Sequence, residues 1–412
     1  MKKNVKYLLG ILTIVIVFVG VIVFIKLNKD FPKGSVQAGY RRCYVDEGMY
    51  FVRGNSVWFF DNVSGKETAV CNKPNCKHND ENCNAYFSGL IGEMLVYDGY
   101  IYIGSFFNEL SHDENNELTM ELDSRFTQLS VDGTKRKEIY NTQNGSLTSA
   151  IAKDGKVYFT AYEYQNGWKP NEYPLDSSLY SYDLRWNKLD KIFTYKADAQ
   201  HYNGNLDIIG CDDDNIFFLY TFWSENGEVT SSIQKYKIGT DKPIELRRDS
   251  QYLDAYVIEG EKYILYRTYK DENIVMEDPL FLVKCNDDFQ DEEKIFVAES
   301  AAIHVLDGYI HIINDDYNKV LFDYKNMKYY VATTSLTGEG KYISDIYNTD
   351  LDKNMVYIDS TDYTGYLPGD ALPGDISNNA ALPWDDFLNE FFIPYEDLNE
   401  QDKEKLWWII LF

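Results

Sequence analysis

The sequence predicts an all-β protein, a seven-bladed β-propeller that follows one N-terminal transmembrane helix, with six or eight blades as the neighbouring counts. One observation is a 19-residue uncharged run near the start of the chain, and another is a strand-and-turn pattern that recurs through the remainder. The third is the composition, with 35 Tyr and 23 Phe among 412 residues. Aromatic residues are enriched in strands, and a hydrophobic content of 44% supplies material for a large core.

The anchor prediction rests on a basic segment, residues 1–6, and the uncharged run 7–25 that follows it. A helix of that length spans roughly 28 Å, close to the thickness of the hydrocarbon core. The run exceeds the apolar region of most cleaved signal peptides and no small-residue cleavage site follows it. We therefore expect an uncleaved, single-pass signal anchor, with a cleaved signal peptide as the alternative. Lys2, Lys3 and Lys6 favour a cytoplasmic N-terminus, which places the remainder outside the cell membrane.

The recurring pattern is an acidic residue, a Gly or polar turn residue, and then alternating aromatic and aliphatic residues. Asp98–Ile103, Asp154–Phe159 and Asp307–Ile312 are its clearest copies. Asp-Gly suits a tight hairpin turn, and the alternation is typical of a strand that packs on one face. The second positions of the copies are residues 48, 99, 155, 214, 260, 308 and 353, so successive copies are 45 to 59 residues apart. This spacing is typical of four-stranded propeller blades, and a meander-rich β-sandwich is the alternative.

The same patterns divide the rest of the chain into segments. We expect, in order, a linker at 26–38, the propeller at 39–363, a Pro/Gly-rich linker at 364–386 and a C-terminal extension at 387–412 that packs on the propeller. Residues 39–45 could supply the strand that closes the last blade. Leu406–Phe412 is strongly apolar but too short to cross a bilayer. We interpret it as a strand or plug on the domain, with a membrane or partner contact as the alternative.

Three cysteines and one histidine lie close together in an insert at residues 71–83. They are Cys71, Cys76, His78 and Cys83, with the spacing C-x4-C-x-H-x4-C. Three thiolates and one imidazole form a complete tetrahedral ligand set for a structural zinc ion. Disulfides are an alternative, because an exported chain meets an oxidising environment and the chain has six cysteines, an even number. Free thiols are the third alternative, and the sequence leaves all three open.

A resemblance covers the same insert. Val70–Cys76, followed by Lys77–His78 and Cys83–Phe87, resembles a segment of uncharacterised surface-anchored β-propeller proteins of anaerobic Gram-positive bacteria. Those proteins are similar in layout, with an anchor, a first blade, the Cys/His segment and further blades. The blade pattern more loosely resembles TolB-like and YWTD-type propellers. The resemblance implies the fold and an exterior location but no activity, and this chain departs from it in having a transmembrane segment where a lipid-bearing Cys is often present.

Charge and motif content narrow the function. A net charge of −26 repels phosphate backbones, which argues against nucleic acid as a partner and leaves a solvated acidic surface or recruitment of a cation or basic partner. No nucleophile elbow, zinc-protease motif or P-loop is present. We therefore expect a non-catalytic binding or scaffold domain with a protein or glycan ligand, contacted for example by the aromatic loop 162–173. The alternative is an extracellular lyase or glycosidase with its site at the channel mouth.

Overall fold

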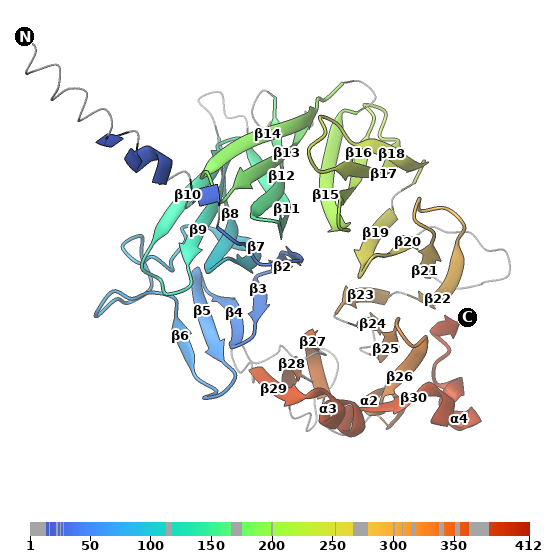
Figure 1. The fold of residues 1–412 in the computed structure, drawn as a ribbon. Coiled ribbons are helices and arrows are strands. Elements are labelled where there is room, and N and C mark those ends of the chain that lie inside the picture. Colours follow the sequence, from blue (N-terminus) through green and yellow to red (C-terminus); the bar gives the residue numbers. More distant parts are fainter. Residues whose placement is uncertain are drawn as a thin grey trace, which may run out of the picture. The chain divides into compact units, whose positions relative to one another are not determined.

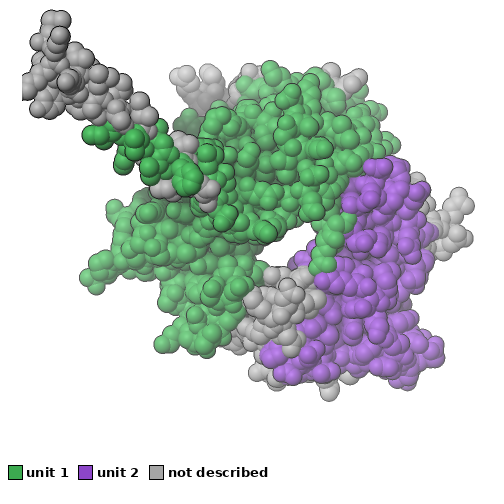
Figure 2. Space-filling model, viewed as in Figure 1, with its two compact units in different colours: residues 1–250, 257–260 green, residues 251–256, 261–412 purple. Residues whose placement is uncertain are grey.

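The computed structural model describes residues 14, 15, 17–21, 24, 26, 27, 29–112, 118–165, 175–198, 201–251, 253–266, 279–299, 301–306, 308–314, 318–337, 342–350, 355–361 and 379–412. The chain forms two compact units (Figures 1 and 2). Unit 1 comprises Met1–Ser250 and Val257–Gly260, and unit 2 comprises Gln251–Tyr256 and Glu261–Phe412. Within the described residues the strands form seven antiparallel sheets, each built mainly from consecutive strands.

Unit 1 contains four sheets, which we call blades 1 to 4 in chain order. Blade 1 consists of β3 (Arg42–Val45), β4 (Gly48–Arg53), β5 (Ser56–Asp61) and β6 (Glu67–Ala69). Blade 2 is built on β7 (Leu90–Tyr97), β8 (Tyr100–His112), β9 (Leu118–Ser130) and β10 (Arg136–Thr142). Blade 3 is built on β11 (Gly145–Lys153), β12 (Lys156–Tyr164), β13 (Leu175–Asp183) and β14 (Lys188–Tyr195). Blade 4 consists of β15 (Asn203–Cys211), β16 (Asn215–Trp223), β17 (Val229–Lys237) and β18 (Ile244–Asp249).

Unit 2 contains blades 5 and 6, except for the last two residues of β19, and one smaller sheet. Blade 5 is built on β19 (Leu253–Ile258), β20 (Glu261–Tyr266), β21 (Pro279–Cys285) and β22 (Glu293–Glu299). Blade 6 is built on β23 (Ala301–Val305), β24 (Tyr309–Asn314), β25 (Lys319–Asp323) and β26 (Lys328–Ala332). The smaller sheet joins β27 (Tyr342–Asp350), β28 (Met355–Thr361) and β29 (Asn379–Pro383). The short helices are α2 (Thr333–Thr337), α3 (Trp384–Phe391), η2 (Tyr395–Asp397) and α4 (Glu400–Glu404).

The predicted all-β propeller is confirmed, but the predicted seven blades are not. Among the described strands, six sheets have four or five strands and are the blades of the propeller, whereas the seventh sheet has three. Each copy of the sequence pattern lies at the start of the second strand of a sheet, from β4 to β28. The pattern therefore marks a hairpin rather than a complete blade, so seven copies overestimate the number of four-stranded sheets.

The hairpin turns explain why Asp-Gly recurs. Asp98 and Gly99 have φ values of 51° and 76°, and Asp154 and Gly155 have values of 48° and 77°. Positive φ at both central residues is the type I′ geometry, whose twist matches that of the flanking strands. The turn chemistry predicted from the sequence is confirmed at these two hairpins.

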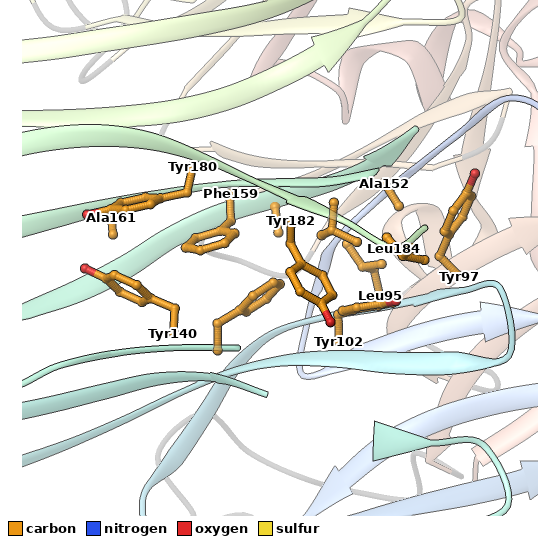
Figure 3. Close-up of a cluster of buried hydrophobic side chains, with 13 residues drawn as sticks. Leu95, Tyr97, Tyr102, Tyr140, Ala152, Phe159, Ala161, Tyr180, Tyr182 and Leu184 are labelled. Atoms are coloured by element: carbon orange, nitrogen blue, oxygen red, sulfur yellow. The ribbon is translucent and has the colours of Figure 1, made fainter. Parts of the chain in front are cut away.

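The core of each unit lies between neighbouring sheets. Tyr102 of blade 2 and Phe159 and Tyr180 of blade 3 belong to one buried cluster (Figure 3), which also contains Phe126 of blade 2. The ring centroids of Phe126 and Phe159 are 4.6 Å apart, and those of Phe159 and Tyr180 are 5.2 Å apart. Offset or tilted rings at these separations gain contact energy beyond simple burial. The many aromatic residues therefore hold one blade against the next.

The N-terminal segment crosses the first strands of two blades before it starts blade 1. β1 (Ser35–Gln37) pairs with β11, and β2 (Gly39–Tyr40) pairs with β7. The predicted linker 26–38 therefore contains a strand, and residues 39–45 do not close the last blade. Both interpretations missed these pairings because strands of two or three residues are too short to show alternation.

The C-terminal segment adds a strand to the last strand of blade 5 and another to the last strand of blade 6. β30 (Phe392–Pro394) pairs with β26, and β31 (Ile409–Leu411) pairs with β22, while β29 completes the smaller sheet. The predicted linker 364–386 thus contains β29 and the start of α3, and its residues 364–378 lie outside the described residues. In α3 the buried residues are Trp384, Phe387 and Phe391.

The predicted transmembrane run 7–25 lies partly outside the described residues, because residues 7–13, 16, 22, 23 and 25 are not described. Residues 14, 15, 17–21 and 24 are helical. Across the part of the chain that the structure describes, no helix combines the length and apolar character needed to cross a membrane. The large apolar side chains described between Ile14 and Leu27 are 50% to 69% exposed.

Candidate metal centre

The loop that joins blades 1 and 2 brings the four predicted ligands together. The ligand atoms of Cys71, Cys76, His78 and Cys83 all lie within 4.8 Å of one another. In a tetrahedral zinc site, bond lengths of 2.0 to 2.3 Å place neighbouring ligand atoms about 3.5 to 3.8 Å apart. His78 Nδ1 and Cys83 Sγ are 3.4 Å apart. The cluster needs only a small contraction to match a tetrahedral zinc site.

Tight turns fold the ligands toward one point. Asn75 and His78 adopt the left-handed conformation, with φ values of 58° and 56°. The backbone N–H of Cys76 donates to the carbonyl of Lys73 at 3.4 Å, and that of Cys83 donates to Asp80 at 3.0 Å. Left-handed backbone is uncommon outside glycine, and Asn and His are among the residues that adopt it more often. The Asn-rich intervals between the ligands therefore supply the turns that the cluster requires.

Blade 1 supports one side of the ligand loop. Ser56 Oγ in β5 donates to the carbonyl oxygen of His78 at 2.6 Å, which fixes the backbone of the imidazole ligand. The N–H of Val57 donates to the carbonyl of Ala85 at 3.0 Å, and that of Phe87 donates to Asn55 at 2.8 Å. These bonds extend the strand pairing of β5 onto the end of the loop.

Blade 2 supports the other side. Asn84 Nδ2 donates to the carbonyl of Gly133, in the turn between β9 and β10, at 2.7 Å. Gly133 has a φ of 68°, and a Cβ placed there would lie 2.7 Å from the Cα of Cys71. Arg136 lies over the ring of Phe87, with its guanidinium carbon 4.2 Å from the ring centroid. The ligand loop is therefore held between the first two blades.

The thiols of Cys71 and Cys83 differ in the direction in which their pKa values are shifted. Burial opposes ionisation of Cys71, but hydrogen bonds from the backbone N–H groups of Lys73 and Asn84 and from neighbouring thiols outweigh it and lower its pKa. Burial raises the pKa of the Cys83 thiol to about 12, and the adjacent Cys71 contributes to the rise. A doubly charged cation among the thiols would favour their ionised forms.

The ligand set fits a structural zinc ion better than a catalytic one. Three sulfurs and one nitrogen match the preference of zinc, and four protein ligands leave no open position for substrate. All six cysteines lie among the described residues, and none of them forms a disulfide. Cys43 is buried in the same apolar cluster as Cys83 but is not part of the ligand group, and Cys211 and Cys285 lie in other blades.

A second candidate site, which we call the inner cavity, lies between blades 2 and 3 and was not predicted from the sequence. Its volume is about 110 Å³. It is lined by Tyr40, Gly92, Glu93, Gly104, Ser105, Phe106, Ser146, Leu147 and Thr148. These residues come from β2 and from the strands β7, β8 and β11. The one available signal was a single charged residue within the otherwise apolar strand Leu90–Tyr97.

Glu93 is the only ionisable carboxyl in the lining of the inner cavity. Burial, with a smaller contribution from the charge of Asp207 in β15, raises its pKa to about 7. No described side chain or backbone group forms a hydrogen bond or ion pair with its carboxyl. Asp207 itself accepts a hydrogen bond from Asn205 Nδ2 at 2.5 Å. The aromatic loop suggested by the sequence lies mostly outside the described residues, which resume at residue 175.

Models of known protein families and curated proteins give no match to the chain. Among solved structures, the chain is similar to the β-propeller domain of the trilobed protease from Pyrococcus furiosus, with 10% identity, 80% of this chain and 91% of that chain covered, and a TM-score of 0.45. It is also similar to an α-L-arabinofuranosidase of Fusarium graminearum in complex with arabinobiose. The identity is 9%, the match covers 71% of this chain and 94% of that chain, and the TM-score is 0.34. A putative 6-phosphogluconolactonase from Bacteroides fragilis has 8% identity, 72% and 91% coverage, and a TM-score of 0.29. At such values none of these likenesses assigns an activity.

Proposed function

We propose that this chain is a non-catalytic binding propeller of the cell surface, whose ligand is an extracellular protein or glycan. The observation that carries the proposal is the inner cavity, where a carboxyl, hydroxyls and aromatic rings from neighbouring strands converge. Ligand sites typically combine an apolar lining with a few polar groups, and strands hold such groups rigidly. The absence of a recognised catalytic motif from the sequence supports binding over catalysis.

The proposed location is the outer face of the cell membrane, with residues 7–25 as a single-pass anchor. The described apolar side chains between Ile14 and Leu27 are exposed, and a contiguous exposed apolar surface marks a contact with a membrane or a partner. The resemblance of residues 70–87 to surface-anchored propeller proteins supports the same location. A chain that lacks residues 1–27 should leave the membrane fraction, while the full chain should resist carbonate extraction. Full-length chain in the carbonate supernatant would contradict the anchor.

We propose further that Cys71, Cys76, His78 and Cys83 bind one structural zinc ion. The supporting observation is that the four ligand atoms already lie together, at a position braced by both blade 1 and blade 2. In this proposal the metal stabilises the ligand loop and takes no part in ligand binding. Zinc analysis of the purified full chain tests it, and a chain that contains six titratable thiols and no metal would contradict it.

The binding function is tested with the full chain in detergent micelles, applied to an array of cell-wall glycans and to immobilised cell-surface proteins. We expect saturable binding that Glu93→Gln weakens. Glu225→Gln is the matched control, because Glu225 is an exposed glutamate in the turn between β16 and β17. If Glu93→Gln bound every glycan and protein as tightly as the native chain does, the inner cavity would not be the binding site.

A second candidate function, a glycan-active enzyme, is favoured by one observation. The pKa of Glu93 is raised to about 7, chiefly by burial and partly by the nearby Asp207, and a carboxyl with a raised pKa supplies the general acid of many hydrolases. Hydrolysis of aryl glycosides by the full chain, lost in Glu93→Gln, would establish this function. No turnover across a panel of pentosides and hexosides, together with glycan or protein binding, would leave the binding function as the one supported.

A further inference from the structure

We infer that the inner cavity is a binding site for a primary ammonium group on a short alkyl stem, presented by the ligand of the binding function proposed above, on which this inference rests. A lysine side chain is one carrier of this group. Three independent features of the cavity lead to it, namely its unbalanced charge, its unused hydroxyl and its size.

The carboxyl group that lines the cavity has no cationic partner among the described residues. Glu93 lines the cavity, and Asp207 lies close enough for its charge to act on Glu93. No Lys, Arg or His is present in the lining, and among the described residues no cationic side chain pairs with Glu93. A partly buried carboxylate without a cationic partner is costly, and a cationic ligand would offset that cost. The overall charge of −26 also attracts cations to the molecule.

An unused hydroxyl supplies a second polar contact. Ser105 is only 8% exposed and lines the cavity, and its hydroxyl forms no hydrogen bond with any described residue. Thr148, by contrast, already bonds to Thr160 Oγ1 at 2.6 Å and to the carbonyl of Leu206 at 2.8 Å. A primary ammonium group has three N–H donors. The Glu93 carboxylate and the Ser105 oxygen can accept two of them.

The size and rim of the cavity favour an alkylammonium over other ligands. A cavity of about 150 Å³ holds benzene, so one of about 110 Å³ has room for an ammonium group on a short alkyl stem. Phe106 and Tyr40, which is 70% exposed, supply aromatic surface for an alkyl stem and for a cation–π contact. Calcium takes six to eight oxygen ligands, several of them carboxylates. One carboxylate and a few hydroxyls fall short of that set, so a calcium ion is the weaker alternative.

The ammonium site is tested with n-butylammonium chloride as the probe and n-butanol as its uncharged counterpart. Binding to the full chain in micelles is measured by saturation-transfer NMR and calorimetry at pH 8. We expect n-butylammonium to bind and n-butanol to bind at least about tenfold more weakly. Glu93→Gln should weaken n-butylammonium binding at least about tenfold, and Ser105→Ala several-fold, while Glu225→Gln should leave it unchanged.

The pH dependence adds a readout that a merely structural role would not change. Among the residues that line the cavity or act electrostatically on Glu93, the other titratable ones are Tyr40 on β2 and Asp207 on β15. Binding should weaken as the pH falls from 8 to 6, because Glu93 becomes protonated. Equal binding of butanol and butylammonium, or full binding by Glu93→Gln, would overturn the inference. Binding of a glycan or protein without any ammonium binding would overturn it while leaving the proposed function intact.

Discussion

Glu93→Gln gives the sharpest prediction, because it removes a buried charge and keeps the shape of the side chain. The pKa of Glu93 is about 7 in the folded protein, against 4.5 for an ordinary glutamate, chiefly because of burial and secondarily because of Asp207. The folded state therefore holds the proton more tightly than the unfolded state. The resulting destabilisation is absent at low pH and grows as the pH rises from about 4.5 through about 7.

The magnitude follows from the gap between the two pKa values. At 1.36 kcal/mol per pH unit, a gap from 4.5 to about 7 destabilises the folded state by about 3 kcal/mol at pH 8. At pH 5 the same relation leaves only about 1 kcal/mol. Glutamine has no charge at either pH, so the variant lacks this pH-dependent destabilisation. The variant should therefore be more stable than the native chain by about 3 kcal/mol at pH 8.

The assay is guanidinium unfolding of the full chain, followed by tryptophan fluorescence at pH 5 and pH 8. Native and variant proteins are compared at the same pH, so that any loss of metal at low pH affects both equally. Glu225→Gln, at an exposed position, should change the free energy of unfolding by less than about 0.5 kcal/mol at both pH values. A stabilisation by Glu93→Gln that is equal at pH 5 and 8, or a destabilisation at pH 8, would refute the assignment of an unpaired buried carboxylate.

Three further predictions concern the ligand loop and the C-terminal segment. His78→Ala leaves three ligands. After dialysis against a chelator the variant should retain less zinc than the native chain, and it should melt at a lower temperature. An undiminished zinc content, measured by mass spectrometry, would contradict the metal centre. Gly133→Ala should lower the free energy of unfolding by more than about 2 kcal/mol, since its Cβ would lie 2.7 Å from the main chain of the ligand loop. Gly227→Ala, also at positive φ but with no atom within 4 Å, should lower the free energy of unfolding by only about 1 kcal/mol in the same guanidinium assay. Equal costs for the two variants would show that the ligand loop adjusts. Trp408→Ala should lower the free energy of unfolding by about 3 kcal/mol or more, because Trp408 is 1% exposed. Trp407→Ala is the control: Trp407 is 64% exposed, so the free energy of unfolding should change by less than about 0.5 kcal/mol. Similar values for both variants would contradict the packing of this segment.

The fold was predictable where its determinants are local. Asp98-Gly99 and Asp154-Gly155 specify hairpin turns by their own backbone preferences, so the second strand of each sheet could be located from the sequence. The number of complete blades was not predictable, because it depends on which later strands add to a sheet. β1, with only three residues, has no detectable alternation, and its place is set by distant residues of β11.

The two candidate sites differ in the same way. The four metal ligands lie within residues 71–83, so the site could be predicted from their residue types and spacing. The structure brings all four together. The groups around the inner cavity come from separate strands. Glu93, Ser105 and Asp207 belong to β7, β8 and β15 and become neighbours only when three blades pack. The supports of the metal cluster, such as Ser56 and Gly133, were likewise invisible in the sequence.

The pairing of β1 and β2 has a consequence for how unit 1 is made. These strands emerge from the ribosome before the blades that they join, since residues 35–37 pair with residues 151–153. Until β7 and β11 have been synthesised, the first segment has no partner, and an unpaired edge strand is open to association with other chains. Contacts between such distant residues slow folding. The last strand, β31, faces no such delay, because β22 precedes it in the chain. The vulnerable interval in biosynthesis therefore falls at the beginning of translation rather than at its end.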